Sequence, residues 1–242
     1  MQVSLSAFLY RRLCRFVTCE LNLPTGGRLA LRTKYDVASC ADVFCHPFYW
    51  TSLSFLTAPP EHVIDCGACC GHFSILADVF LKSRFGSAET KFTLIEGNPL
   101  AIPVLKRNLA DAGLLERARV VHSVLGTPAT SQASLWVDHR NWLSASTQPL
   151  PGARQFHVPT SDLASLTVNG SVGVLKIDIE GAEHRLIESE PEVFRHTAMV
   201  LAELHGSTGE KDGFIAKCEE LGSHVIGTPF QHAGHLVAAF AR

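Results

Sequence analysis

The chain has 242 residues, of which 46% are hydrophobic and 18% are charged, and its formal net charge is −2. This composition excludes an intrinsically disordered chain and is sufficient for one sizeable domain, with or without an appendage. The near-neutral charge gives no electrostatic case for nucleic-acid binding, which usually needs a basic patch. The eight cysteines follow no disulfide framework, so we expect reduced thiols and a cytoplasmic protein.

The first 60 residues are expected to form an extension of helices and strands. Apolar residues near the start recur at helical spacing and predict an amphipathic helix over residues 1–20: Leu5, Phe8, Leu9, Leu13 and Phe16. Alternation in residues 28–37 predicts a strand, paired in a hairpin with residues 38–44, and residues 46–56 are expected to be helical. No stretch reaches the roughly 18 apolar residues that a membrane-spanning helix needs, so no membrane span is expected.

The core is expected to begin after Pro59 and Pro60 and to span residues 61–242. Five strands are predicted, at residues 62–67, 91–97, 118–125, 173–179 and 198–205. The helices predicted between them span residues 72–84, 99–112, 182–189 and 209–221. Nearly continuous apolar strands that alternate with helices predict a parallel sheet covered on both faces.

The end of the chain breaks this alternation. Residues 223–230 and 235–242 are both strand-like and only four residues separate them, so they must pair as an antiparallel hairpin. Residues 127–159 are the least regular stretch of the core. A long insertion beside a ligand cleft is often a lid over the substrate.

The first core strand ends in a turn that carries two glycines, within VIDCGACCG (63–71). Asp65 is placed to contact the cationic end of a nucleoside cofactor, directly or through water. Gly67 and Gly71, with Ala68 in the same turn, would let the backbone approach that cofactor, because a side chain would fill the space. The GxxxG spacing departs from the GxGxxG fingerprint of dinucleotide sites. An ordinary strand–turn–helix junction is the structural alternative.

Polar residues also end the next two strands. Glu96 lies 25 residues after Gly71 and is placed to accept hydrogen bonds from both ribose hydroxyls, with capping of the following helix as its alternative role. Asn98 is expected to cap that helix and is included in the cofactor site. Ser123 and Val124 follow in the third strand, where an adenine pocket would lie.

The segments VIDCGACCG, LIEGNP, LKIDIEGAE and LAELH occur in the order seen in the FkbM family of S-adenosylmethionine (SAM)-dependent methyltransferases, which the chain resembles over residues 60–240. The resemblance implies SAM as cofactor and, as in many members, methyl transfer to a hydroxyl of a sugar, glycan or secondary metabolite. The fold class expected is α/β, a Rossmann-like class I methyltransferase with a mostly parallel seven-stranded sheet that ends in an antiparallel C-terminal hairpin. By this likeness the cofactor would be held by Asp65, Gly67, Gly71 and Glu96. The methyl-transfer end would hold Asp178, Glu180 and Gly181, with Glu203 and His205 on the neighbouring strand.

Cys69 departs from this family, which commonly carries Asn at that place. A thiol cannot reproduce the hydrogen bonds of an amide, so we expect weaker cofactor binding or a differently braced turn. The run formed by Cys66, Cys69 and Cys70 lacks the further ligands of a zinc site, and no metal is expected there or elsewhere. Small, mildly apolar packing residues are the preferred interpretation.

An acceptor hydroxyl must lose its proton during methyl transfer, and the candidate bases are Asp178, Glu180 and His205. Asp178 has the best position, at the exit of the fourth strand, although it could instead hold the acceptor or the cofactor's amino group. His205 is equally compatible with a histidine satisfied at the edge of the core. Because two neighbouring carboxylates repel each other, Asp178 or Glu180 should have a raised pKa. Lys176 is expected to pair with an acid, and His184 to lie on a helix face.

Two other functions stay open. The same fold serves RNA and protein methyltransferases, but the chain has no basic segment interleaved with aromatic residues and no NPPY-like tetrapeptide. A non-catalytic protein that binds SAM or another nucleoside is indicated only by Cys69. We therefore expect a small-molecule or glycan hydroxyl acceptor and no nucleic-acid partner.

Overall fold

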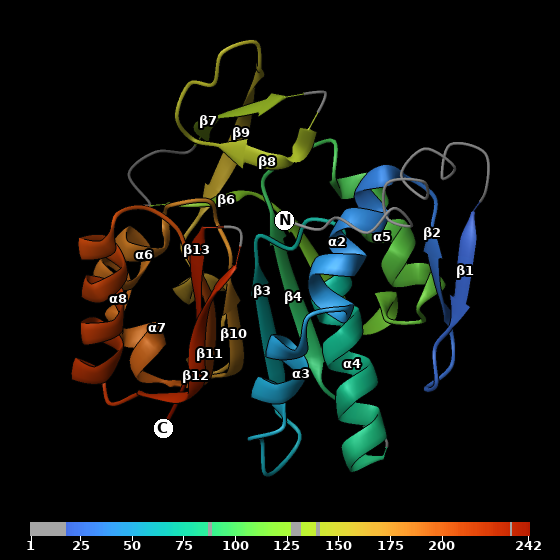
Figure 1. Ribbon diagram of the computed structural model, residues 1–242, viewed down its shortest axis with the longest axis horizontal. Helices are drawn as coiled ribbons and strands as arrows, with labels where there is room; N and C mark the ends of the chain where they lie inside the picture. The colour runs from blue at the N-terminus through green and yellow to red at the C-terminus, as the bar shows by residue number, and fades with distance from the viewer. Residues whose placement is uncertain (1–17, 87–88, 127–131, 139–140, 233) are drawn as a thin grey trace.

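A seven-stranded sheet forms the centre of the computed structural model, which describes residues 18–86, 89–126, 132–138, 141–232 and 234–242 (Figure 1). Its strand order is β12-β13-β11-β10-β3-β4-β5. The strands are β3 (His62–Cys66), β4 (Lys91–Glu96), β5 (Ala118–His122), β10 (Val172–Ile177), β11 (Thr197–Leu204), β12 (His224–His232) and β13 (His235–Ala241). β13 runs in the direction opposite to the other six strands of this sheet, so the expected mostly parallel sheet with an antiparallel C-terminal hairpin is confirmed.

Helices cover both faces of this sheet (Figure 1). One face packs against α2 (Lys34–Phe44), α3 (Pro47–Leu53), α4 (His72–Phe85) and α5 (Ile102–Asp111), and the other against α6 (Glu183–Ser189), α7 (Pro191–Arg195) and α8 (Thr208–Glu220). Two short 3₁₀ helices span Leu115–Arg117 and Ala164–Leu166. Alternation along β3 separates the two cores, because Val63 packs into the first and Ile64 and Cys66 into the second. None of the described helices is long and apolar enough to cross a membrane.

The structure corrects the prediction for residues 28–44. β2 (Arg28–Leu31) is a short strand that pairs with β1 (Cys19–Asn22), and the rest of the predicted hairpin is helix α2. Thr33 Oγ1 accepts a hydrogen bond from the Asp36 backbone N–H at 3.0 Å, and Asp36 Oδ2 accepts one from the Thr33 N–H at 2.8 Å. This capping box stabilises the start of a helix, although the apolar residues that follow it alternate as they would in a strand. The amphipathic positions of the predicted helix over residues 1–20 lie outside the described residues.

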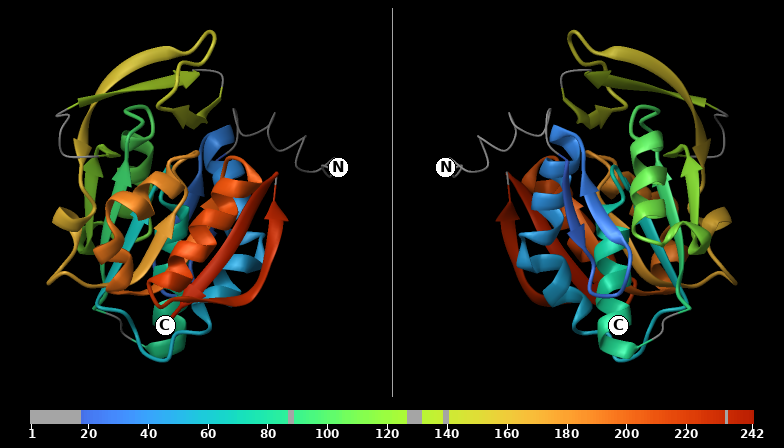
Figure 2. Two further views of the ribbon diagram at one scale, coloured as in Figure 1. Left: turned by 90° about the vertical axis from the view of Figure 1, so that its left-hand side faces the viewer. Right: turned by 90° about the vertical axis from the view of Figure 1, so that its right-hand side faces the viewer.

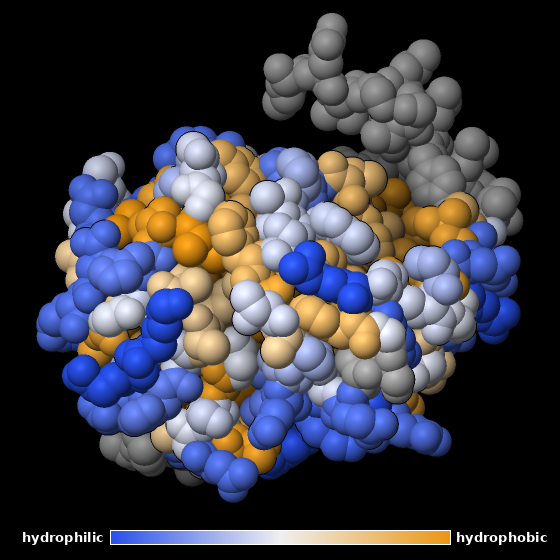
Figure 3. Space-filling view, turned by 90° about the horizontal axis from the view of Figure 1, so that it is seen from below, coloured by the Kyte–Doolittle hydropathy of each residue, from blue (hydrophilic) through white to orange (hydrophobic). Residues whose placement is uncertain are grey.

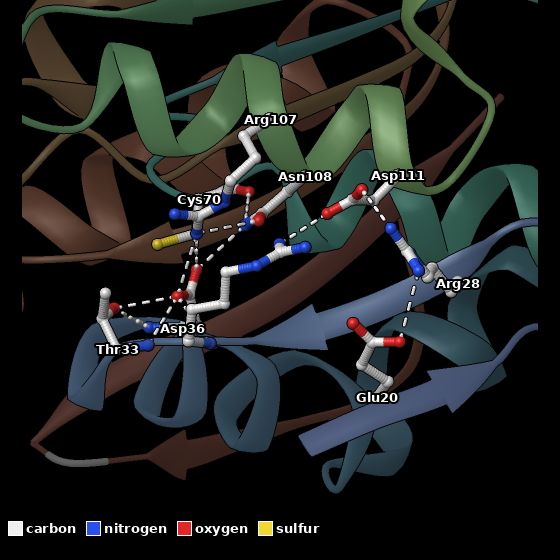
Figure 4. Close-up of polar contacts among 9 residues, drawn as sticks. Glu20, Arg28, Thr33, Asp36, Cys70, Arg107, Asn108 and Asp111 are labelled. Atoms are coloured by element: carbon white, nitrogen blue, oxygen red, sulfur yellow. Dashed lines mark hydrogen bonds and ion pairs between the residues drawn. The ribbon is translucent and has the colours of Figure 1, made fainter. Parts of the chain in front are cut away.

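Asp36 also fastens this N-terminal segment to the rest of the protein (Figure 4). Its fully buried carboxylate accepts hydrogen bonds from Arg107 Nη2 at 3.1 Å and from Asn108 Nδ2 at 3.0 Å, both on α5. Asn108 Nδ2 donates a second hydrogen bond to the Cys70 carbonyl oxygen at 3.0 Å. The segment before residue 60 is thereby tied to the turn that follows β3, and the domain boundary at that residue stays a prediction.

A second sheet stands over the carboxyl ends of the parallel strands (Figure 2). It contains β6 (Val124–Leu125), β7 (Gln132–Asp138), β8 (Asn141–Ser146) and β9 (Arg154–Ser161), in the order β6-β9-β7-β8. The description of residues 127–159 as irregular is therefore wrong for the part of that stretch the structure describes. The opposite end of the molecule carries separate apolar patches among polar side chains (Figure 3).

Two element boundaries near the cleft also differ from the prediction. The strand expected over residues 118–125 is broken at Ser123, because β5 belongs to the large sheet and β6 to the small one. The helix expected from Pro99 begins at Ile102, after a turn in which Asn98 Oδ1 accepts a hydrogen bond from the Leu100 N–H at 3.0 Å. Asn98 thus stabilises the turn before the helix and does not cap the helix itself.

Candidate functional site

Two adjoining cavities lie at the carboxyl ends of β3, β4, β10 and β11. The first has a volume of about 110 Å³ and the second of about 330 Å³. Five residues line both of them: Gly67, Cys69, Leu143, Asp178 and Glu180. A ligand in the first cavity would therefore meet a ligand in the second beside Asp178 and Glu180.

The first cavity brings together most of the residues predicted to bind the cofactor. Its predicted lining residues are Gly67, Glu96, Asn98, Ser123 and Val124. The small sheet closes it with residues that the sequence did not single out: Leu135, Leu143 and Ala145. The stretch expected to be a lid thus supplies one wall of this cavity.

Glu96 braces the turn that follows β3. Its Oε2 accepts a hydrogen bond from the Cys69 backbone N–H at 2.7 Å, and its Oε1 accepts one from the Asn98 N–H at 2.6 Å. Burial raises the pKa of Glu96, against the opposing effect of these two hydrogen bonds. Because the bond uses the Cys69 main chain, the turn keeps this brace whatever side chain Cys69 carries.

The two glycines of the turn are required for different structural reasons. A Cβ on Gly67, whose φ is +76°, would lie 1.7 Å from the Asp178 carbonyl oxygen, so only glycine lets β3 and β10 meet here. A Cβ on Gly71 would lie 2.6 Å from Leu105 Cδ1, so Gly71 permits the packing of α4 against α5. Ala68 lines only the second cavity.

Asp65 lies behind the turn, fully buried. It accepts a hydrogen bond from Ser74 Oγ at 2.8 Å, and its Oδ1 lies 3.3 Å from Lys176 Nζ. The same ammonium lies 3.6 Å from Asp178 Oδ2 and donates to the Gly67 carbonyl oxygen at 2.8 Å. Burial alone would lower the pKa of Lys176, but the charges of Asp65 and Asp178 raise it well above its usual value. The pairing expected for Lys176 is therefore confirmed. Asp65 itself lines neither cavity, and it influences the second one through Lys176, which does line it.

The second cavity has an acidic side and an aromatic side. Asp178, Glu180 and Glu203 lie on the first together with His205 and His235. The aromatic side includes Phe48, Tyr49 and Phe230, with the ring of His46 stacked on Phe230 at 4.6 Å. The aromatic residues and His235 come from segments that carry no sequence signal of a site.

Glu183 positions His205, a role that the sequence analysis did not assign. Its Oε1 lies 2.9 Å from His205 Nδ1 and also accepts hydrogen bonds from the backbone N–H groups of Ile179 and Gly181, both at 3.1 Å. His205 Nε2 then faces Glu180 at 3.7 Å and Asp178 at 3.9 Å. Burial alone would lower the pKa of His205, but the bond to Glu183 and the nearby carboxylates raise it to about 9.

The carboxylates of this cavity influence one another. Burial, followed by the charge of Asp178, raises the pKa of both Glu180 and Glu203 to about 7. A raised pKa within the Asp178–Glu180 pair agrees with the expectation. Glu180 also has φ +55° and Cys69 has φ +48°, a backbone strain that is concentrated at ligand sites.

Comparison with known proteins gives one family and many structures of the same fold. A family model described as "Methyltransferase FkbM domain" matches residues 65–233. A precorrin-6y C5,15-methyltransferase of Geobacter metallireducens GS-15 is 11% identical, with 80% of this chain and 86% of that chain covered and a TM-score of 0.50. A protein of Pyrococcus horikoshii proposed to be an RNA methyltransferase is 12% identical, with 85% and 84% covered and a TM-score of 0.49. No curated protein matches the chain.

The structural similarities, at such low identity, show the fold alone. The family match spans well over half of the chain and contains both the turn after β3 and the acids at the end of β10. SAM is the cofactor of these enzymes, and the first cavity fits it: Glu96 presents a buried carboxylate, and Ser123 Oγ is buried without a hydrogen-bond partner among the described residues. The chain belongs to the FkbM methyltransferase family.

Proposed function

We propose that the protein is a SAM-dependent O-methyltransferase that acts on a hydroxyl group of a sugar, glycan or secondary metabolite. The observation that carries this proposal is the junction of the two cavities at Asp178 and Glu180. When bound, SAM supplies an electrophilic methyl group on a sulfonium. A junction lined by carboxylates suits both that positive charge and a hydroxyl that must lose a proton.

The residues of the first cavity are suited to a nucleoside. Each oxygen of Glu96 accepts one backbone hydrogen bond, which leaves lone pairs for the two ribose hydroxyls. Ser123 Oγ is buried and has no hydrogen-bond partner among the described residues, so it is available to the adenine ring. Val124 and Leu135 supply apolar contacts beside it.

Asp178 is the proposed base. It lines both cavities, and Lys176 fixes its carboxylate at 3.6 Å, so that the acceptor hydroxyl in the second cavity can donate to it. SAM held in the first cavity would supply the methyl group to the acceptor oxygen, and its sulfur would keep the electron pair of the carbon–sulfur bond. The hydroxyl proton passes to Asp178 Oδ. Holding the two reactants in line supplies much of the rate, and the base adds about 10²–10⁴-fold.

The test is a search for the acceptor with the purified protein. SAM carrying a labelled methyl group is incubated separately with polyhydroxylated sugars, glycans, secondary metabolites, RNA and protein, and the position of the label is read by NMR. Labelled methyl on an oxygen of a sugar, glycan or secondary metabolite supports the proposal. Label on a ring nitrogen, on RNA or on protein would overturn the proposal in favour of one of the alternative methyltransferase activities. SAM binding without methyl transfer to any acceptor class would favour a non-catalytic protein.

A further inference from the structure

We propose that Glu203, His205 and His235 form a binding site for a divalent transition-metal ion, with Zn²⁺ as the representative, in the wall of the second cavity. One ligand atom of each residue can be chosen so that all three lie within 4.8 Å of one another. Two imidazoles and one carboxylate are a ligand set that Zn²⁺ accepts, and three protein ligands leave open coordination positions. The cysteines of the turn after β3 contribute nothing to this site.

The large sheet places these three residues together. β11 and β13 pair antiparallel with Leu204 opposite Leu236, so His205 and His235 follow as the next opposed pair at the cavity end of the ladder. Their ring centroids are 4.1 Å apart. Glu203 lies two residues before His205, so alternation puts both side chains on the same face. A site on two hydrogen-bonded strands is held more precisely than one on loops.

His205 has the support that a metal-binding histidine usually has. Glu183 is a buried carboxylate whose Oε1 lies 2.9 Å from His205 Nδ1, so it accepts a hydrogen bond from that nitrogen and leaves Nε2 as the ligand atom. Two backbone N–H groups fix the same Glu183 oxygen. A carboxylate bonded to the far nitrogen of a ligand histidine sets its tautomer and orientation in metal sites.

The charge of the surroundings also favours a cation. Asp178 and Glu180 lie 3.9 and 3.7 Å from His205 Nε2. Of the lysines nearby, Lys176 is already shared between Asp65 and Asp178, and Lys211 donates to the Gly234 carbonyl oxygen at 3.2 Å. A divalent ion that replaces the Nε2 proton would be attracted by the same carboxylates.

The open positions of the ion would face the cavity of about 330 Å³. An acceptor oxygen bound there would have a lowered pKa, because the ion acts as a Lewis acid, and Asp178 would take its proton more readily. The acceptor class that fits is one with a second oxygen next to the methylated hydroxyl, such as a vicinal diol. This catalytic role rests on the proposed function, whereas metal binding itself does not.

Metal binding is measured on protein freed of metal with a chelator, by calorimetric titration with Zn²⁺ and by the visible spectrum of the Co²⁺ form. We expect one ion per chain, with much weaker binding of Mg²⁺, which prefers oxygen ligands. Replacing a ligand (His235→Gln or Glu203→Gln) should lower Zn²⁺ affinity by more than about 100-fold, and Glu183→Gln by about 10–100-fold. His224→Gln, an exposed site on the same hairpin, is the matched control and should change nothing.

The outcomes separate the two proposals. Absence of stoichiometric Zn²⁺ binding, or equal binding by the wild type and both ligand variants, overturns the metal site. Circular dichroism and SAM affinity are measured on every variant, and a loss of Zn²⁺ with SAM binding retained supports it. Metal binding in a protein that transfers no methyl group would leave the site standing and remove the proposed function.

Discussion

Lys176 Nζ lies 3.3 Å from Asp65 Oδ1, and neither side chain reaches solvent appreciably. The lysine belongs to β10 and the aspartate to β3, opposite each other in the parallel register. Lys176 also contacts Asp178, which follows β10 and lines both cavities. A single ammonium group therefore links β3 to the point where the two cavities meet.

Removing one partner of this pair should destabilise the fold strongly. Lys176→Met leaves the buried Asp65 without the cation that it faces, and Asp65→Asn leaves Lys176 with only the more distant Asp178. Each change should lower the free energy of unfolding by about 3–5 kcal/mol. The double variant should lose less than the sum of the two single losses, because no unpaired charge remains from the pair. Urea denaturation of the four proteins measures this, and additive losses would show that the two residues are not coupled.

Gly67→Ala should disrupt the site because the new Cβ would lie 1.7 Å from the Asp178 carbonyl oxygen. Gly113→Ala is the matched control: Gly113 has a similar φ of +71°, but a Cβ there meets nothing within 4 Å. The control should lose about 1 kcal/mol of stability through backbone strain alone and keep its SAM affinity. Thermal denaturation and SAM calorimetry compare the two, and equal behaviour would mean that close approach at Gly67 is unimportant.

Glu96→Ala should weaken SAM binding by about 1–3 kcal/mol, the loss expected when a charged acceptor of hydroxyl groups is removed. NAD should not bind to the wild-type protein at a concentration at which SAM saturates it. Glu192→Ala, on the exposed surface of α7, serves as the control. Calorimetry gives both dissociation constants, and an unchanged value for a folded Glu96→Ala variant would remove Glu96 from the ribose role.

Asp178→Asn should lower turnover by at least about 10²-fold while SAM affinity changes by less than about tenfold, because the base acts on the acceptor. Initial rates and SAM calorimetry on the same preparation make the comparison. If SAM binding collapses instead, Asp178 belongs to the cofactor site. A wild-type rate would show that Asp178 is not the base.

His72 should make the protein less stable in mild acid. Burial lowers its pKa from 6.5 to about 4, and its Nδ1 contacts Ser39 Oγ at 2.9 Å. Below pH 6.5 the unfolded chain binds a proton that the folded chain does not bind until about pH 4, so stability is lost as the pH falls through this window. The slope contributed by His72 approaches about 1.4 kcal/mol per pH unit.

Urea denaturation at several pH values checks this contribution against His72→Gln, which keeps a polar group beside Ser39. The difference in stability between wild type and variant should shift in favour of the variant as the pH falls from neutral to 5. A difference that stays constant with pH would show that His72 is not buried in its neutral form.

Local sequence patterns predicted much of the fold. The apolar strands that end at Cys66, Glu96 and Ile177 were found because burial on both faces leaves a continuous apolar run. The antiparallel hairpin followed from the short connection between its two strands. The alternation in residues 28–37 predicts a hairpin where the structure has α2, because the capping box of Thr33 and Asp36 starts a helix at Lys34.

By itself, the sequence determined the family, the turn after β3 and the acids that end β4 and β10, because each is recognised from a short run of consecutive residues. Only the tertiary structure decided which distant residues share the site. Glu203, His205 and His235 meet through the pairing of β11 with β13, and the small sheet closes the first cavity from above. Such contacts depend on the register between strands far apart in the chain, and local propensity carries no information about register.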